Sequence, residues 1–229
     1  MTPQPRRPVT ARAVSRDVGL GLVSSEALRV DTADAAPPEM ARFQSMNPFH
    51  IEEAWRIPVP GQQLRSRSVE SIWQGLKVVD GTTDSTMLGA RASKRPPEAM
   101  RGPDFDYAAT RFQYGENEID LVSARFLIYL PAYLYMLEHL VPVVVTDEIG
   151  HAAEHGVVVF YDWDDNFDIT DDRCSFSHSA ILASWFGGRL HETMLAPRAA
   201  WLAAHPAIAE FARGAPEPPL RRYHCLHEH

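Results

Sequence analysis

The longest apolar stretch of the chain restricts its fold more than any other feature. Phe126–Leu137 reads FLIYLPAYLYML, twelve residues without a charge, between Arg125 and Glu138. A helix needs about 20 apolar residues to span a bilayer, so this stretch is too short and no membrane association is expected. It predicts a buried core helix, within a longer helix over about 119–139 that is interrupted or kinked at Pro131.

The overall composition is that of a soluble globular protein. The chain has 229 residues, of which 45% are hydrophobic and 23% charged, and this excludes a collagen-like or wholly disordered chain. Its net charge of -8 argues against general nucleic-acid binding, which depends on Lys and Arg neutralising phosphates. Two cysteines cannot form a disulfide framework, and no secretory signal is visible, so we expect a cytoplasmic protein. The sequence carries no signature of an oligomeric state.

Periodicity and capping signals predict an α+β chain, predominantly helical, with a small β-sheet. The convincing helices are 69–79, capped by Ser68, one that begins after Ser175 or Ser177, and an Ala-rich helix over 197–213. Short strands are expected at 10–14, 28–31 and in the VVVFYD run at 157–162. We predict a single domain over residues 9–213, a flexible leader over 1–8 and a mobile tail over 214–229.

The helix predicted at 69–79 carries the sharpest functional signal. At 100° per residue, Glu70, Gln74 and Lys77 fall within one sector, which Trp73 borders. In a pocket, this row could supply an acid/base, an orienting hydrogen bond and a nucleophile. Only two of the 22 basic residues are lysines, Lys77 and Lys94, which suggests that a remaining lysine is needed as an amine. The alternative is a solvated polar stripe, with Glu70 favoured by the helix dipole.

The sequence motifs in and around this helix resemble those of a known family. SVESIWQGLKV, Ser68–Val78, is similar to the SVEHYYQAQKF-type signature of the NADAR (YbiA-like) superfamily, with Ser68, Glu70, Gln74 and Lys77 matching in place. FQSMNPF at 43–49 and the later VVVFYDWD and SFSHSAIL blocks follow in the order of that superfamily, across roughly residues 40–190. An uncharacterised branch, with the S-V-E-x-I-W-Q-G-L-K motif, shows the greater similarity.

The resemblance implies a YbiA-like fold and chemistry at the N-glycosidic bond of a ribosyl group. Glu70 would act as acid/base and Lys77 as a possible Schiff-base nucleophile. An acid of the later loop would contribute, Asp162 as first choice and Asp168 as second. The Gly-rich run that follows this acid in typical members is replaced here by acidic residues and Asn166. The expected protein is an N-glycosidase of nucleotide metabolism, acting on a phosphorylated ribosylamine or an ADP-ribosyl group, without a cofactor. The alternative is a noncatalytic nucleotide- or ADP-ribose-binding module.

Further residues are candidate substrate contacts, each with a structural alternative. A basic run, of which Arg95 is the first choice, could bind a phosphate or be a solvated loop. Arg125 could bind a phosphate or a structural partner. Tyr129 and Tyr133, one turn apart, could stack on a base or pack in the core. The complete set of candidate substrate contacts is Trp73, Gln74, Arg95, Arg125, Tyr129, Tyr133, Asn166 and His178.

One motif suggests a metal. His151-Ala-Ala-Glu154-His155 matches the inverted zinc-peptidase pattern H-x-x-E-H, which needs a firm helix and a distant third ligand. Gly150 and Gly156 bracket the motif, so an exposed helix end without metal is expected, and a zinc hydrolase at His151 and His155 is the weaker alternative.

Overall fold

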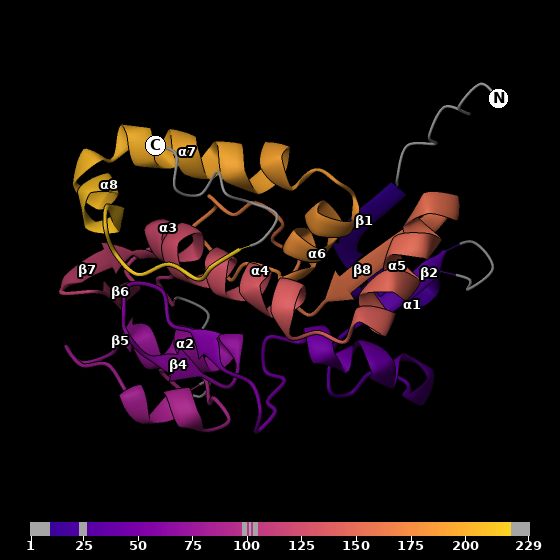
Figure 1. The fold of residues 1–229 in the computed structure, drawn as a ribbon, viewed down its shortest axis with the longest axis horizontal. Coiled ribbons are helices and arrows are strands. Elements are labelled where there is room, and N and C mark those ends of the chain that lie inside the picture. Colours follow the sequence, from indigo (N-terminus) through magenta and orange to yellow (C-terminus); the bar gives the residue numbers. More distant parts are fainter. Residues whose placement is uncertain (1–9, 23–26, 98–99, 101, 103–104, 221–229) are drawn as a thin grey trace. The chain divides into compact units, whose positions relative to one another are not determined.

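The chain is an α+β domain with 45% helix and 15% strand in small sheets, as predicted. The computed structural model describes residues 10–22, 27–97, 100, 102 and 105–220 (Figure 1). The predicted leader lies outside the described residues, as does the tail beyond 220. Two compact units are present: unit 1 comprises Met1–Asn47, Val141–Asp168 and Phe176–Ala196, and unit 2 comprises Pro48–Leu140, Ile169–Ser175 and Pro197–His229.

Unit 1 is built on a parallel sheet with strand order β1-β8-β2. Its elements are β1 (Thr10–Ser15), α1 (Arg16–Gly21), β2 (Leu28–Asp31), the 3-10 helix η1 (Pro38–Met46), α5 (Val143–His155), β8 (Val157–Asp162), α6 (Ser179–Phe186) and the π-helix η5 (His191–Leu195). The central strand β8 is the predicted VVVFYD run, and its four middle residues, Val158–Tyr161, are buried. Because all three strands are parallel, β2 and β8 end at the same edge, at Asp31 and Asp162. The predicted strands at 10–14, 28–31 and 157–162 are therefore confirmed.

Unit 2 combines short antiparallel strands with the apolar core helix. Its elements are β3 (Ile57–Pro58), β4 (Arg65–Ser66), α2 (Val69–Leu76), β5 (Lys77–Val78), the 3-10 helix η2 (Ser85–Gly89), β6 (Arg111–Tyr114), β7 (Asn117–Asp120), α3 (Leu121–Ala124), the π-helix η4 (Arg125–Tyr129), α4 (Leu130–His139), α7 (Ala196–Ala204) and α8 (Pro206–Ala212). The strands form the sheets β3-β4 and β5-β6-β7. α2 packs against η2, η4 and α4.

The core helix is long enough to cross a membrane by length and composition alone. Leu121–His139 spans 19 residues, and 89% of its apolar window is buried inside the protein, which is the pattern of a core helix. The sequence predicted an interruption of this helix at Pro131. The irregular turn is η4, which ends shortly before Pro131, and there the Leu130 N–H donates to the Arg125 carbonyl. Pro131 has no backbone N–H, so it cannot donate the next i to i−4 hydrogen bond of an α-helix. The wider π turn lies directly before this missing donor.

Two predicted helix boundaries are wrong. The helix expected at 69–79 ends at Leu76, because the next two residues pair with β6. The helix expected at 197–213 is divided into α7 and α8 at His205. His205 precedes Pro206 and takes a non-helical conformation, as the proline ring disfavours the α region there.

Candidate functional site

The helix α2 begins where the sequence predicted and positions the acid of the candidate site. The Ser68 hydroxyl accepts the Ser71 N–H at 3.0 Å, an N-cap that fixes the first turn. Glu70 follows within that turn, and its N–H donates to the Pro48 carbonyl at 2.8 Å. The Glu70 side chain is buried, with 7% of the residue exposed. A solvated polar stripe is therefore wrong for this face of the helix.

Glu70 and Gln74 form the predicted pair one turn apart. The Gln74 Nε2 donates to Glu70 Oε1 at 2.7 Å, and Gln74 is itself buried. The amide oxygen of Gln74 accepts the Arg95 backbone N–H at 2.8 Å. Gln74 is thus held at both ends, and its amide orients one oxygen of the carboxyl group.

Lys77 reaches the same network from a strand, not from the helix. It is the C-cap of α2, with φ -65° and ψ 130°, and the first residue of β5, where it pairs with Phe112. Its Nζ donates to the Arg95 carbonyl at 3.0 Å and lies 5.9 Å from the centre of the Phe112 ring. Hydrogen bonds therefore connect four residues, Glu70, Gln74, Arg95 and Lys77. We call this set the Glu70–Lys77 network.

Arg95 has a structural position within this network. Its guanidinium Nη1 donates to the carbonyls of Gln74 at 3.1 Å and Lys77 at 3.0 Å, and its Nη2 donates to that of Thr82 at 3.2 Å. Carbonyls at a helix C-terminus lack intrahelical partners and carry partial negative charge, which a guanidinium satisfies. The contacts of Arg95 favour this capping role over the predicted phosphate contact.

Aromatic rings lie beside the network. The Trp73 ring packs on Phe112, with centroids 4.0 Å apart, and meets the edge of Tyr129 at 5.3 Å. Tyr129 stacks on Tyr133 at 5.9 Å, and both tyrosines are buried, as the core-packing alternative predicted. Trp73 is only half-buried, whereas Phe112, Tyr129 and Tyr133 are buried.

Arg125 occupies a structural position in the core. The residue is 1% exposed, and its guanidinium donates from Nη1 to the carbonyls of Ile169 (3.2 Å) and Asp171 (2.6 Å) and from Nη2 to that of Cys174 (2.6 Å). A buried guanidinium needs such partners, because removing it from water is costly. These contacts match the structural alternative and not the phosphate contact.

Two of the candidate residues in unit 1 meet at the end of the parallel sheet. The Asp162 Oδ2 accepts from His178 Nδ1 at 2.7 Å, and His178 Nε2 lies 2.6 Å from the Thr32 hydroxyl oxygen. The Asn47 amide in turn donates to the Thr32 carbonyl at 2.8 Å. Thr32 and His178 are buried. The carboxylate, imidazole and hydroxyl are therefore hydrogen-bonded in a row, in the order that a proton relay requires. Thr32 is not among the residues predicted from the sequence.

The environment of Asp162 favours its charged form. Burial, the largest single effect, raises its pKa, but the charge and hydrogen bond of His178, together with the Trp163 N–H and the Ser177 hydroxyl, outweigh it and lower the pKa. With the carboxylate ionised, Nδ1 of His178 carries a proton. When the His178 ring is neutral, Nε2 accepts a hydrogen bond from the Thr32 hydroxyl group. When the ring is charged, Nε2 donates a hydrogen bond to the Thr32 hydroxyl oxygen.

Three further residues of the acidic loop, Asn166, Asp168 and Asp171, have partners close by in the sequence. The Asn166 side-chain oxygen accepts the Asp168 N–H at 3.0 Å, and its carbonyl accepts the Ser177 N–H at 2.9 Å, so Asn166 shapes the loop. Asp168 is exposed, whereas the Asp162 side chain is only 14% exposed, which favours Asp162 over Asp168 as the acid of the loop. Asp171 pairs with Arg173 at 2.6 Å, as expected for an acid that meets an arginine.

The candidate residues thus belong to two sets. The Glu70–Lys77 network, Trp73, Arg125 and the two tyrosines lie in unit 2, whereas Asp162, Asn166, Asp168 and His178 lie in unit 1. The participation of Asp162 or Asp168 in a reaction at Glu70 stays a prediction.

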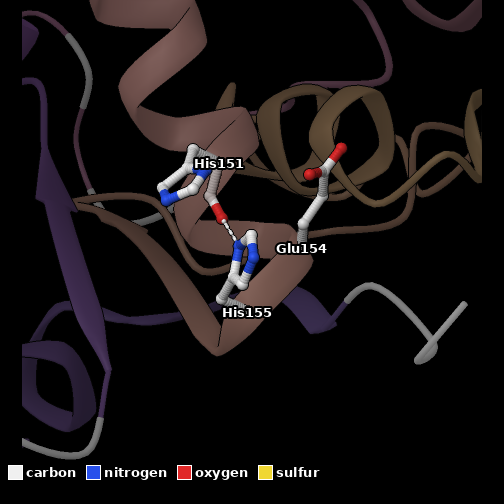
Figure 2. Close-up of side chains that lie close together, drawn as sticks. All are labelled: His151, Glu154 and His155. Atoms are coloured by element: carbon white, nitrogen blue, oxygen red, sulfur yellow. Dashed lines mark hydrogen bonds between the residues drawn. The ribbon is translucent and has the colours of Figure 1, made fainter.

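The weaker metal motif has the helix that its chemistry needs. His151, Glu154 and His155 lie in the last turns of the thirteen-residue helix α5 (Figure 2). The flanking glycines were expected to weaken this helix. Instead, Gly150 lies within it, and Gly156 forms its C-cap. All three side chains are exposed, as expected for a helix end.

Comparison with known proteins identifies a family but no activity. No curated protein matches the chain. No solved structure matches it either. One family model, described as a family of unknown function (DUF6939), matches residues 24–182, which include α2, the core helix and the strand β8. Because this match covers more than half of the 229 residues, the chain belongs to the DUF6939 family.

Proposed function

We propose that the protein is an N-glycosidase that cleaves a ribosylated, phosphorylated nucleotide-like compound. The observation that carries the proposal is the Glu70–Lys77 network, in which a buried carboxyl group and a buried amine are linked through the Gln74 amide and the backbone N–H and carbonyl of Arg95. Burying two ionisable side chains costs free energy that a solvated stripe does not incur, so a functional role explains them. The resemblance of Ser68–Val78 to the NADAR signature supports the same chemistry.

The network supplies the groups for covalent catalysis at a ribosyl carbon. Glu70 protonates the sugar ring oxygen, and the C1′–O4′ bond breaks as the nitrogen of the base forms an iminium bond to C1′, which makes C1′ electrophilic. The neutral Lys77 amine adds to C1′, one of its protons passes to the nitrogen of the base, and the C1′–N bond to the base breaks, which leaves a protonated imine between Lys77 and C1′. Water adds to the imine and releases the free sugar, which regenerates the amine.

Other residues of the network position these groups. Gln74 fixes one Glu70 oxygen, and the Arg95 carbonyl holds the Lys77 amine in place. The half-buried Trp73 offers a ring for stacking on the base of the substrate. These assignments give Gln74 and Arg95 positioning roles and reserve the chemistry for Glu70 and Lys77.

Borohydride trapping tests the covalent step. The protein is incubated with ribosylamines, nucleotides and ADP-ribosylated bases, reduced, digested and analysed by mass spectrometry. We expect a reduced sugar adduct on Lys77 and loss of turnover in Lys77→Arg, because a guanidinium keeps its charge but is not a nucleophile here. The matched control is Lys94→Arg, which changes the exposed second lysine and should retain turnover and adduct.

Two results would change the assignment. If Lys77→Arg retains turnover on the compound that the wild type cleaves, Lys77 is a substrate contact and the covalent mechanism is wrong. If compounds of the panel bind without cleavage, the protein is a binding module and the hydrolase proposal fails.

A further inference from the structure

The last turns of α5 present three metal-ligating side chains on one surface of unit 1. His151, Glu154 and His155 each offer a ligand atom, and these atoms lie within 4.8 Å of one another. Residues three and four positions apart lie on the same side of an α-helix, so the arrangement follows from the helix itself. Figure 2 shows the three side chains on this single element, whose bounds are Val143–His155.

A hydrogen bond prepares one histidine for ligation. The Nδ1 of His155 lies 2.8 Å from the His151 carbonyl oxygen, drawn as the dashed line in Figure 2. A carbonyl only accepts, so Nδ1 is the protonated nitrogen, and Nε2 of the neutral ring keeps its lone pair. Metal-binding histidines commonly donate their second N–H to a carbonyl in this way, which fixes the tautomer and the ring orientation.

The two rings are already close enough to share an ion. Their centroids are 4.3 Å apart, and their planes make an angle of 41°. All three residues are exposed, so ligation needs only side-chain rotation and displaces no packed core. The chain's net charge of -8 favours cations in general.

We propose that His151, His155 and Glu154 form a binding site for a divalent transition-metal ion of the Zn²⁺, Ni²⁺ and Cu²⁺ class. Two imidazoles and one carboxylate suit these ions, whereas Mg²⁺ and Ca²⁺ need more oxygen ligands than the site provides. Water completes the coordination. The site is a binding site that is independent of the proposed glycosidase chemistry.

The bound ion would connect the last two turns of α5. Gly156 ends the helix directly after His155, and β8 begins at Val157. An ion that binds the folded helix and not the unfolded chain stabilises the folded state. Metal binding should therefore raise the melting temperature of the protein.

Isothermal titration calorimetry tests the proposal. The sequence also ends in His224, His227 and His229, so the three are changed to Gln in the full-length background protein to remove a competing chelator. NiCl₂ and ZnCl₂ are titrated into this background, with MgCl₂ as the comparison ion. We expect one site per chain for Ni²⁺ and Zn²⁺, no heat from Mg²⁺, and a rise in melting temperature with Ni²⁺.

Single substitutions locate the site. His151→Gln and His155→Gln should each weaken Ni²⁺ binding at least tenfold, because the remaining imidazole and the Glu154 carboxylate bind the ion more weakly than all three groups together. Glu154→Gln should weaken it severalfold. The control is His191→Gln, an exposed histidine outside α5, which should leave the affinity unchanged. Circular dichroism confirms that each variant is folded. The proposal is overturned if the background protein binds neither ion, or if binding survives in His155→Gln.

Discussion

Replacing Arg125 by methionine tests whether this buried cation holds the core together. In the wild type, its guanidinium donates to the carbonyls of Ile169, Asp171 and Cys174. Methionine keeps much of the aliphatic stem but has no donor. Arg125→Met would therefore leave three carbonyls of the 169–174 segment without this partner.

The expected loss is large for a single substitution. Hydrogen bonds to a charged group contribute about 1.5–3 kcal/mol each, and the variant no longer has to bury a guanidinium, which offsets part of the loss. We expect a net destabilisation of about 3–5 kcal/mol, because a buried acceptor left without a partner costs about 1–3 kcal/mol and three carbonyls lose this donor. This loss is a large fraction of the ordinary stability of a domain, about 5–15 kcal/mol, and only a protein at the low end of that range would become marginally folded.

Urea denaturation followed by circular dichroism measures this change. Arg125→Lys should be intermediate, because an ammonium cannot reproduce the planar fork of donors. The control is Arg173→Met, which removes an exposed partner of Asp171 and should leave the free energy of unfolding nearly unchanged. A loss below about 1 kcal/mol for Arg125→Met would refute the structural role and return Arg125 to the candidate phosphate contacts.

Further predictions concern acid stability, packing, a surface ion pair and catalysis. The pKa of Asp162 is lowered in the folded protein, so its contribution to stability is present above the unfolded value of about 3.9 and is lost as pH falls through the folded pKa; the difference in urea stability between wild type and Asp162→Asn should therefore begin to shrink at about pH 4 and vanish below the folded pKa. Gly19→Ala should lower the melting temperature by several degrees, because its Cβ would overlap the buried Tyr161 ring. Arg42→Ala should change the free energy of unfolding by under about 1 kcal/mol, since its partner Glu148 is exposed to a similar degree. Glu70→Gln should reduce turnover by about 10²–10⁴, measured on any compound that the wild type cleaves, because it removes proton transfer.

Local signals predicted the framework of the fold. The Ser68 cap and the apolar spacing of Val69, Ile72 and Leu76 fix α2, and the β-branched run fixes β8. The end of α2 could not be read in the same way. Lys77 leaves the helix because it pairs with Phe112, a partner 35 residues away that helical periodicity does not reveal.

The candidate site was predicted in part for a similar reason. Glu70 and Gln74 are four residues apart on one helix, so their contact follows from helix geometry alone. The hydrogen bonds among Thr32, His178 and Asp162 connect the ends of β2 and β8 to the start of α6. The residues around Thr32 form no recognisable motif, so the sequence does not point to this threonine. The sequence predicted a phosphate contact for Arg95 because its charge can be seen in a basic run. The backbone carbonyls at the end of α2 to which Arg95 donates cannot be identified from the sequence.

The π turn at Arg125–Tyr129 has a consequence for how the length of this chain can vary. A single π turn accommodates one more residue than the α-helical path on either side of it. Deleting one residue from this turn would restore a regular α-helix and keep the buried face of Leu130–His139 in register with its neighbours. The same deletion after Tyr133 would rotate every following side chain by about 100°, turning core residues toward the surface. The core helix therefore has a place where a single-residue deletion in a related sequence can be tolerated, and this place includes the arginine that binds the 169–174 segment.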